Sequence, residues 1–249
     1  MSAASPSRTA AIMQPTYLPY LGYFQLMAAA SVFVFLDDVQ FARRSWQSRN
    51  RILTAQGELM LTVPVRKHDR DTPIHAIQID DSQPWRDKHL AAIRHAYGKR
   101  PFFAQGWAFV SEQLTRERDG GLADLTCGMA QATAAALGLT PAFVRASDLK
   151  APGARSEHLL AICRTVEAQE YLSPMGSADY MEEDGVFQAA DFPARFQPFQ
   201  LAEYPQGRDP FTPYMGFVDA LMNVGWDGMR GLVVSTHARA IRASGAPPP

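Results

Sequence analysis

Two short apolar runs near the start of the chain restrict the fold more than any other feature. They are "AAIM" at residues 10–13 and "VFVFLD" at 32–37, and a segment with the character of a helix, residues 22–30, lies between them. Uninterrupted apolar strands of this kind are typical of parallel sheets, which are covered on both faces. A strand, a crossover helix and a second strand form a βαβ unit, so we expect an α/β fold.

The rest of the chain continues this alternation. We expect helices at 85–98, 102–115, 121–137, 157–168 and 214–225, and strands at 59–65, 74–80, 170–174 and 142–149, the last running into a polar loop. The pattern predicts a mostly parallel sheet with flanking helices, in a Rossmann-like or nucleotidyltransferase-like topology with a smaller helical and C-terminal portion. We expect one domain over residues 9–240, with a subdivision near 150 left open, between flexible ends at 1–8 and 241–249.

Length, charge and cysteine usage limit the environment and the partners. The 249 residues, 47% of them hydrophobic, are enough for one sizeable core. The formal charge is −1 and no basic run occurs, so neither DNA nor a membrane surface is an expected partner. No window approaches the roughly 20 apolar residues of a membrane span. Two scattered cysteines and no signal peptide before Met13 make the cytoplasm the expected location.

The loop between the first strand and its helix, "QPTYLPYLGY" at residues 14–23, has the residues of a binding site. Pro15 and Pro19 stiffen its path, and Gly22 lets the backbone approach a neighbour closely. Ligands of such sheets lie beyond the carboxyl ends of the strands. An amide, hydroxyl groups and ring faces are offered there by Gln14, Tyr17, Tyr20 and Tyr23. In the alternative, the tyrosines merely pack across the sheet edge.

The segment "FLDDVQFARRSWQSRNRI", residues 35–52, should meet the same edge. Arginines hold phosphates or carboxylates, a tryptophan offers a stacking face, and carboxylates accept hydroxyl or ammonium protons. The candidates are Asp37, Asp38, Gln40, Trp46, Arg49, Asn50 and Arg51. A solvated edge with ion pairs is the alternative.

Further candidates follow along the chain. Lys88 and His89 lie near the start of the helix at 85–98, where an imidazole could act as a general base. Polar residues at later strand ends could complete the crevice, namely Ser173, Tyr180, Tyr204 and Gln206. No Gly-x-Ser-x-Gly elbow, Walker loop or zinc-spaced Cys/His set is present, and no metal site is predicted.

Two resemblances add to this interpretation. The spacing Y-x-G-Y at Tyr20, Gly22 and Tyr23 resembles the His-x-Gly-His signature of nucleotidyltransferases and pantothenate synthetase, with both histidines absent. This likeness implies the α/β topology and argues against nucleotidyl transfer. From about residue 10 to 232 the chain resembles the WbqC-like family, in segments that include "MQPTYLPYLGYFQLM", "SEHLLAICRTVEAQEYLSPMGSADYM" and "FTPYMGFVDALMNVG". Met13 and Ser48 depart from the residues usual in that family, so Trp46, Arg49 and Asn50 are the positions that transfer.

The family resemblance implies a bacterial role in decorating a sugar or specialised metabolite, in surface polysaccharide (O-antigen-type) or natural-product biosynthesis. The leading hypothesis is a cytoplasmic transferase that places an acyl or aminoacyl group on an amine. His89 or Asp38 would be the base, and Tyr20 or Tyr23 would steady the oxyanion. An acyl-carrier or aminoacyl-tRNA donor is conceivable. No cofactor is predicted, although ATP or a nucleotide-linked substrate would fit. The alternatives are a non-catalytic sugar-nucleotide-binding partner of a glycosyltransferase and an ATP-dependent amide ligase.

Overall fold

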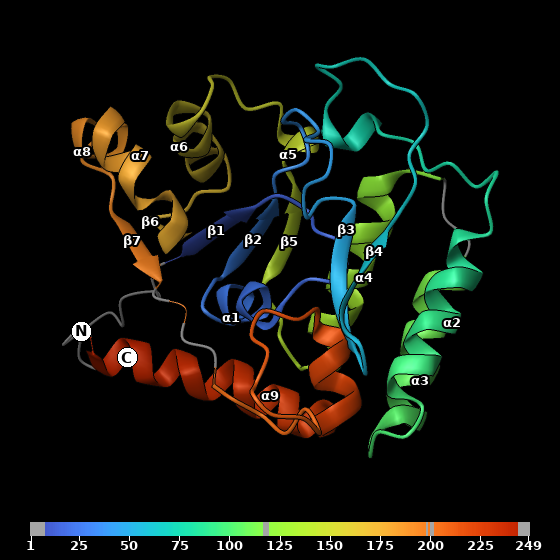
Figure 1. Cartoon of the computed structure of the whole chain (residues 1–249). Helices are drawn as coiled ribbons and strands as arrows, with labels where there is room; N and C mark the ends of the chain where they lie inside the picture. Colours follow the sequence, from blue (N-terminus) through green and yellow to red (C-terminus); the bar gives the residue numbers. More distant parts are fainter. Residues whose placement is uncertain (1–7, 117–119, 198, 200–201, 244–249) are drawn as a thin grey trace.

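The computed structural model describes residues 8–116, 120–197, 199 and 202–243, with residues 235–243 as backbone alone. A five-stranded parallel sheet lies at its centre (Figure 1). Its strands, in spatial order, are β5 (Ala142–Arg145), β2 (Val32–Phe35), β1 (Thr9–Met13), β6 (Glu170–Pro174) and β7 (Ala194–Gln197). In chain order this arrangement is third, second, first, fourth and fifth strand, which confirms the predicted Rossmann-like topology.

Helices cover both faces of the sheet. Ala11, Phe33 and Phe35 face one apolar core, whereas their neighbours Ala10 and Val34 face the other. The first core is completed by α1 (Leu21–Ala28), α2 (Trp85–Tyr97), α3 (Phe103–Thr115), α4 (Leu122–Ala136) and α9 (Phe217–Ala243). The second lies against α5 (Ala146–Leu149), α6 (Ser156–Thr165), α7 (Ala178–Asp184) and α8 (Val186–Ala189). Burial on both faces explains why the strands are apolar without alternation.

A separate two-stranded antiparallel sheet consists of β3 (Arg49–Thr54) and β4 (Gly57–Thr62). The expected strand at 59–65 is therefore β4, and its partner β3 was not predicted, because a run that begins Arg-Asn-Arg resembles a polar loop. The strand expected at 74–80 is wrong. This segment forms the single 3₁₀ turn η1 (Ile74–Ala76) and isolated bridges. Its buried isoleucines are spaced three and two apart, so they do not alternate as a strand requires.

The C-terminal helix extends further than the sequence indicated. Gly225, with φ of 69° and ψ of −176°, interrupts α9 where the predicted helix ends, and the helix then resumes to Ala243. A left-handed φ of this kind favours glycine. The remaining short element is the 3₁₀ turn η2 (Met175–Ser177). Of the predicted flexible ends, residues 1–7 and 244–249 lie outside the described residues. Among the helices of the described chain, none has the length and apolarity to cross a bilayer.

Candidate functional site

The carboxyl ends of the five parallel strands lie along one edge of the sheet, which we call the rim. In the register of the sheet, Met13 lies beside Phe35, and Phe35 lies beside Arg145. The order of the strands reverses between β1 and β6, and open α/β sheets bind ligands outside such a point. The predicted site residues at the rim are Gln14, Asp37, Asp38 and Ser173.

Asp37 connects two neighbouring strand ends. Its carboxylate is wholly buried and accepts hydrogen bonds from Arg145 Nε at 2.6 Å, Ser147 N at 2.9 Å and Ser147 Oγ at 3.0 Å. Arg145 also pairs with Asp124 at 2.6 Å. These contacts use both oxygens of Asp37. In this structure Asp37, which was predicted to bind substrate, instead holds the ends of β2 and β5 together.

Asp38 has one bonded and one unbonded carboxylate oxygen. Oδ2 lies 3.0 Å from His158 Nε2, at the first turn of α6. Oδ1 is buried and accepts no hydrogen bond from any described residue, which is uncommon for a buried polar atom. The other ring nitrogen of His158 lies 3.3 Å from the carbonyl oxygen of Pro152. His158 was not among the predicted residues; its place in the first turn of α6 was the available signal.

The loop at residues 14–23 and the segment at residues 35–52 contact each other directly. Tyr17 N donates to Trp46 O at 3.0 Å, and Gln47 Nε2 donates to Gln14 Oε1 at 2.8 Å. The buried Asn50 donates to the carbonyl oxygens of Tyr17 and Leu18 at 3.1 and 2.7 Å. The segments therefore form one unit in which Asn50 holds the backbone of the loop. Gln47 was not predicted.

The remaining predicted residues of this segment lie nearer the solvent. Trp46 is 51% exposed, and Arg51 Cζ lies 5.8 Å from the centre of its ring. Arg51 also pairs with Glu58 at 2.8 Å. The Nε atoms of Arg49 and Arg51 are buried and have no hydrogen-bond partner in the described chain. Gln40 is exposed and donates to the carbonyl oxygen of Arg70 at 2.8 Å, and Lys88 is exposed on α2.

The tyrosines of the loop differ in their surroundings. Tyr17 and Tyr23 are wholly buried, burial raises the pKa of each phenol, and Tyr23 donates to the carbonyl oxygen of Gln14 at 3.2 Å. Tyr20 is partly buried and its ring lies edge-on to Phe199 at 5.0 Å. A Cβ on Gly22 would lie 2.6 Å from Phe199, so the glycine permits this close packing. The alternative that the tyrosines merely pack at the sheet edge therefore describes Tyr17 and Tyr23, whereas Tyr20 remains partly exposed.

His89 lies beneath the loop and is 6% exposed. Its Nδ1 is 2.9 Å from the hydroxyl of Tyr17, and its ring lies edge-on to Trp85. Burial lowers the pKa of His89 to about 4, against a smaller opposing effect of a hydrogen bond to the backbone of Thr62. Tyr17 therefore donates to a neutral imidazole that connects the loop to β4.

Lowering the pH is expected to destabilise the protein through His89. The pKa of His89 is about 4 in the folded protein against 6.5 for the free side chain, so the unfolded chain takes up the proton first. The stabilisation is complete above pH 6.5 and is lost as the pH falls, by roughly 2 kcal/mol between pH 6.5 and 5. Urea unfolding at several pH values measures this. His89→Leu should remove that part of the pH dependence and His95→Gln, an exposed change on the same helix, should not; an unchanged dependence in His89→Leu would contradict the assignment.

Tyr204 and Gln206 belong to a buried network around Asp219 on α9. Asp219 Oδ2 accepts from Tyr204 OH at 2.7 Å and from Gln206 Nε2 at 2.9 Å, and Oδ1 accepts from Tyr97 OH at 2.9 Å. Burial raises the pKa of Asp219, and these hydrogen bonds oppose the rise. Tyr97 in turn accepts from Leu53 N at 2.9 Å, so the network joins α2, β3 and α9.

Ser173 and Tyr180 lie at the end of β6 and just beyond it. Ser173 is buried, donates to Tyr171 OH at 3.2 Å and is hydrogen-bonded to Ser177, whose hydroxyl also reaches the carbonyl oxygen of Pro174 at 2.7 Å. Tyr180 is partly exposed, and partial burial raises the pKa of its phenol. These groups line the β6 side of the rim.

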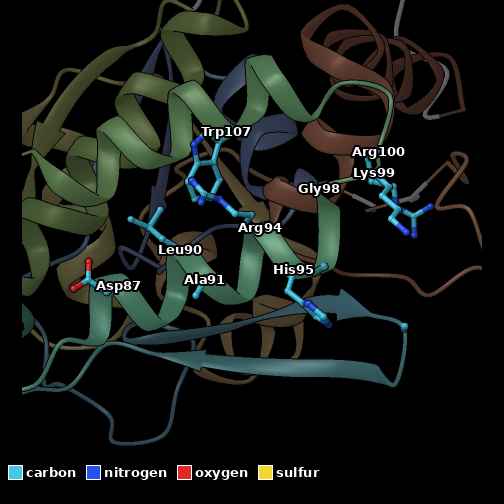
Figure 2. Close-up of a pocket in the computed structure, with 11 residues that line it drawn as sticks. Asp87, Leu90, Ala91, Arg94, His95, Gly98, Lys99, Arg100 and Trp107 are labelled. Atoms are coloured by element: carbon cyan, nitrogen blue, oxygen red, sulfur yellow. The ribbon is translucent and has the colours of Figure 1, made fainter.

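A large cavity of about 1020 Å³ lies away from the rim, along α2 and α3. Figure 2 shows Trp107 next to Arg94, whose Cζ is 4.4 Å from the centre of the indole ring. His95, Lys99 and Arg100 also line this cavity, and none of the predicted site residues does. Within the described residues, no group of three or more His, Cys, Asp or Glu side chains is arranged to hold a metal ion.

Comparisons with known proteins agree with the resemblance in the sequence. The chain is 28% identical over 215 residues to the uncharacterized protein Rv1507c of Mycobacterium tuberculosis, a match that covers 86% of this chain and 93% of that protein. No solved structure matches the chain. The model of the WbqC-like protein family matches residues 14–231. The chain belongs to the WbqC-like protein family.

Proposed function

We propose that the protein is a cytoplasmic biosynthetic transferase that works at the rim. It places an acyl or aminoacyl group on an amine of an activated sugar or specialised metabolite, in surface polysaccharide or natural-product biosynthesis. The order of the strands supports a ligand beside β1 and β6, because loops at such a point diverge and leave a crevice.

The unbonded oxygen of Asp38 carries the proposal. Asp38 Oδ1 lies at the rim without a hydrogen-bond donor among the described residues, whereas Oδ2 is held by His158. Oδ1 is buried, so it can accept a proton from a substrate amine once ligand entry opens a path to it. We assign His158 to the positioning of Asp38. His89, the other predicted base, is less suited, because Tyr17 occupies its Nδ1 and its pKa is about 4.

In the proposed reaction, the amine nitrogen of the acceptor attacks the carbonyl carbon of the donor. The new C–N bond forms, Asp38 takes a proton from the nitrogen, and the bond between the carbonyl carbon and the leaving group breaks. Tyr20 is the loop tyrosine with enough exposure to donate to the oxyanion, and Gln14, Trp46, Arg49, Arg51 and Tyr180 are accessible enough to bind substrate groups.

The test is a search for product with the purified protein. Amine-bearing sugar nucleotides are incubated with acetyl-CoA, an acyl-carrier thioester or an aminoacyl-tRNA, and mass spectrometry detects the amide. Product without ATP supports the transferase. Pyrophosphate release that depends on ATP and a carboxylic acid would identify an amide ligase instead. Thermal stabilisation by sugar nucleotides, with no product from any pair, would identify a binding partner and overturn the proposal.

A further inference from the structure

Two loops that are distant in the sequence lie side by side next to the rim. One is residues 40–44, after β2, and the other is residues 62–70, at the end of β4 and beyond. Gln40 Nε2 donates to the carbonyl oxygen of Arg70 at 2.8 Å, and Arg43 Nε donates to His68 Nε2 at 3.5 Å. Figure 1 shows the loop after β2 and the loop after β4 at the same end of the molecule. We call their joint face the basic surface.

The basic surface concentrates positive charge in a chain whose formal net charge is −1. Its permanent cations are exposed, namely Arg43, Arg44, Arg66, Lys67 and Arg70. In the described part of the chain, none of these side chains pairs with a carboxylate. Asp69 and Asp71 are the acids in the same stretch, and Asp80 interacts electrostatically with Arg66, so five cations lie near three acids and a positive excess remains. Unpaired arginine and lysine side chains that converge in this way favour a multiply charged anion.

Two hollows on the basic surface give it a shape as well as a charge. One has a volume of about 460 Å³ and is lined by residues 40–43, His68 and Arg70. The other has a volume of about 360 Å³ and is lined by residues that include Arg44, Arg66 and Lys67. Both share Phe41, Arg43 and His68, so the hollows are neighbours with an arginine between them.

The shared arginine contacts a histidine of the second loop. His68 Nδ1 is 2.9 Å from the carbonyl oxygen of Asp69, so this nitrogen carries the proton and Nε2 is free to accept from Arg43 Nε. The terminal amino groups of Arg43 have no hydrogen-bond partner among the described residues. They remain available to an anion that spans the two hollows.

We propose that the basic surface binds two or more adjacent phosphates, such as the diphosphate of a sugar nucleotide. Because Arg43 lines both hollows, two adjacent phosphates can contact it together with the other cations of either hollow. The assignment of these phosphates to the substrate of the transfer reaction rests on the proposed function; the binding itself does not. Asp38 lies two residues before Gln40, and His75 N donates to Asp37 O at 2.8 Å, so the basic surface and the rim are joined by short connections.

Isothermal titration calorimetry of the full chain tests the binding. Pyrophosphate, UDP and ADP are expected to bind, uridine is not, and the affinity should fall at high salt. Arg43→Gln and the double change Arg66→Gln with Lys67→Gln should each weaken UDP binding about tenfold, since each removes charge-assisted hydrogen bonds. The matched control is Arg164→Gln, an exposed change at the end of α6, which should leave the affinity unchanged. Thermal unfolding of every variant checks that it is folded.

The outcomes separate this inference from the proposed function. Diphosphate binding that Arg43→Gln weakens supports the inference even if no transfer product is found. The inference is overturned if pyrophosphate, UDP and ADP all fail to bind, or if Arg43→Gln binds them as the wild type does, even if product forms. A 5′-phosphorylated RNA oligonucleotide that binds more tightly than UDP, with the same dependence on Arg43, would assign the phosphates to a donor carried on nucleic acid.

Discussion

Replacing Asp38 with asparagine is expected to lower kcat of the transfer reaction by about 10²- to 10⁴-fold, the usual contribution of general base catalysis. Asparagine has nearly the same shape and cannot take up the amine proton. KM should change little, because the substitution removes an interaction made in the transition state. Steady-state kinetics with the active donor and acceptor measure both constants, and urea unfolding shows whether the variant keeps its stability.

Two further variants give this experiment its controls. His158→Gln should lower kcat less than Asp38→Asn, because glutamine can still donate a hydrogen bond to Asp38 Oδ2. Asp81→Asn removes a carboxylate that pairs with Arg86 at the start of α2, and it should leave kcat unchanged. If Asp38→Asn were as active as the wild type while His89→Leu lost activity, His89 would be the base after all.

Replacing Asp219 with alanine should destabilise the protein by about 3 to 5 kcal/mol, because Tyr97, Tyr204 and Gln206 would lose their buried acceptor. The loss is partly offset because the variant no longer buries a carboxylate. Chemical denaturation monitored by tryptophan fluorescence gives the free energy of unfolding.

Neighbouring variants show whether this network is structural or binds substrate. Tyr204→Phe removes the hydrogen bond to Asp219 and a long one from Gln206 Nε2, and it should cost about 1 kcal/mol with no effect on ligand affinity. Asp227→Ala changes an exposed acid on the same helix and should cost less than about 0.5 kcal/mol. A stable Asp219→Ala variant with weakened substrate binding would instead favour the prediction that Tyr204 and Gln206 are ligands.

The centre of the sheet could be predicted because β1 and β2 are buried on both faces, so they appear as apolar runs such as "VFVF". β3 could not, because its first three residues are charged or polar and only Ile52 and Leu53 are buried apolar residues. The 3₁₀ turn at Ile74 was missed for a related reason: its isoleucines are as apolar as those of a strand, and local composition does not specify backbone path.

The residues of the rim that come directly after a strand could be predicted from the sequence. Asp37, Asp38 and Gln14 directly follow apolar runs, so their position was expected. Their partners were not, since Arg145 lies 108 residues from Asp37 in the sequence and only the completed fold brings them together. The same holds for the basic surface, whose cations come from two loops and form no single run.

Asp38 and His158 form a pair, and the fixed position of the neighbouring Asp37 indicates which side of this pair can move. The carboxylate of Asp37 is anchored to the end of β5, so the backbone beside it has little freedom. His158 instead follows a connection in which Lys150 and Arg155 both have φ of 52°, a strained geometry for residues other than glycine. If ligand entry rearranges the pair of Asp38 and His158, we expect α6 to move and the end of β2 to stay in place.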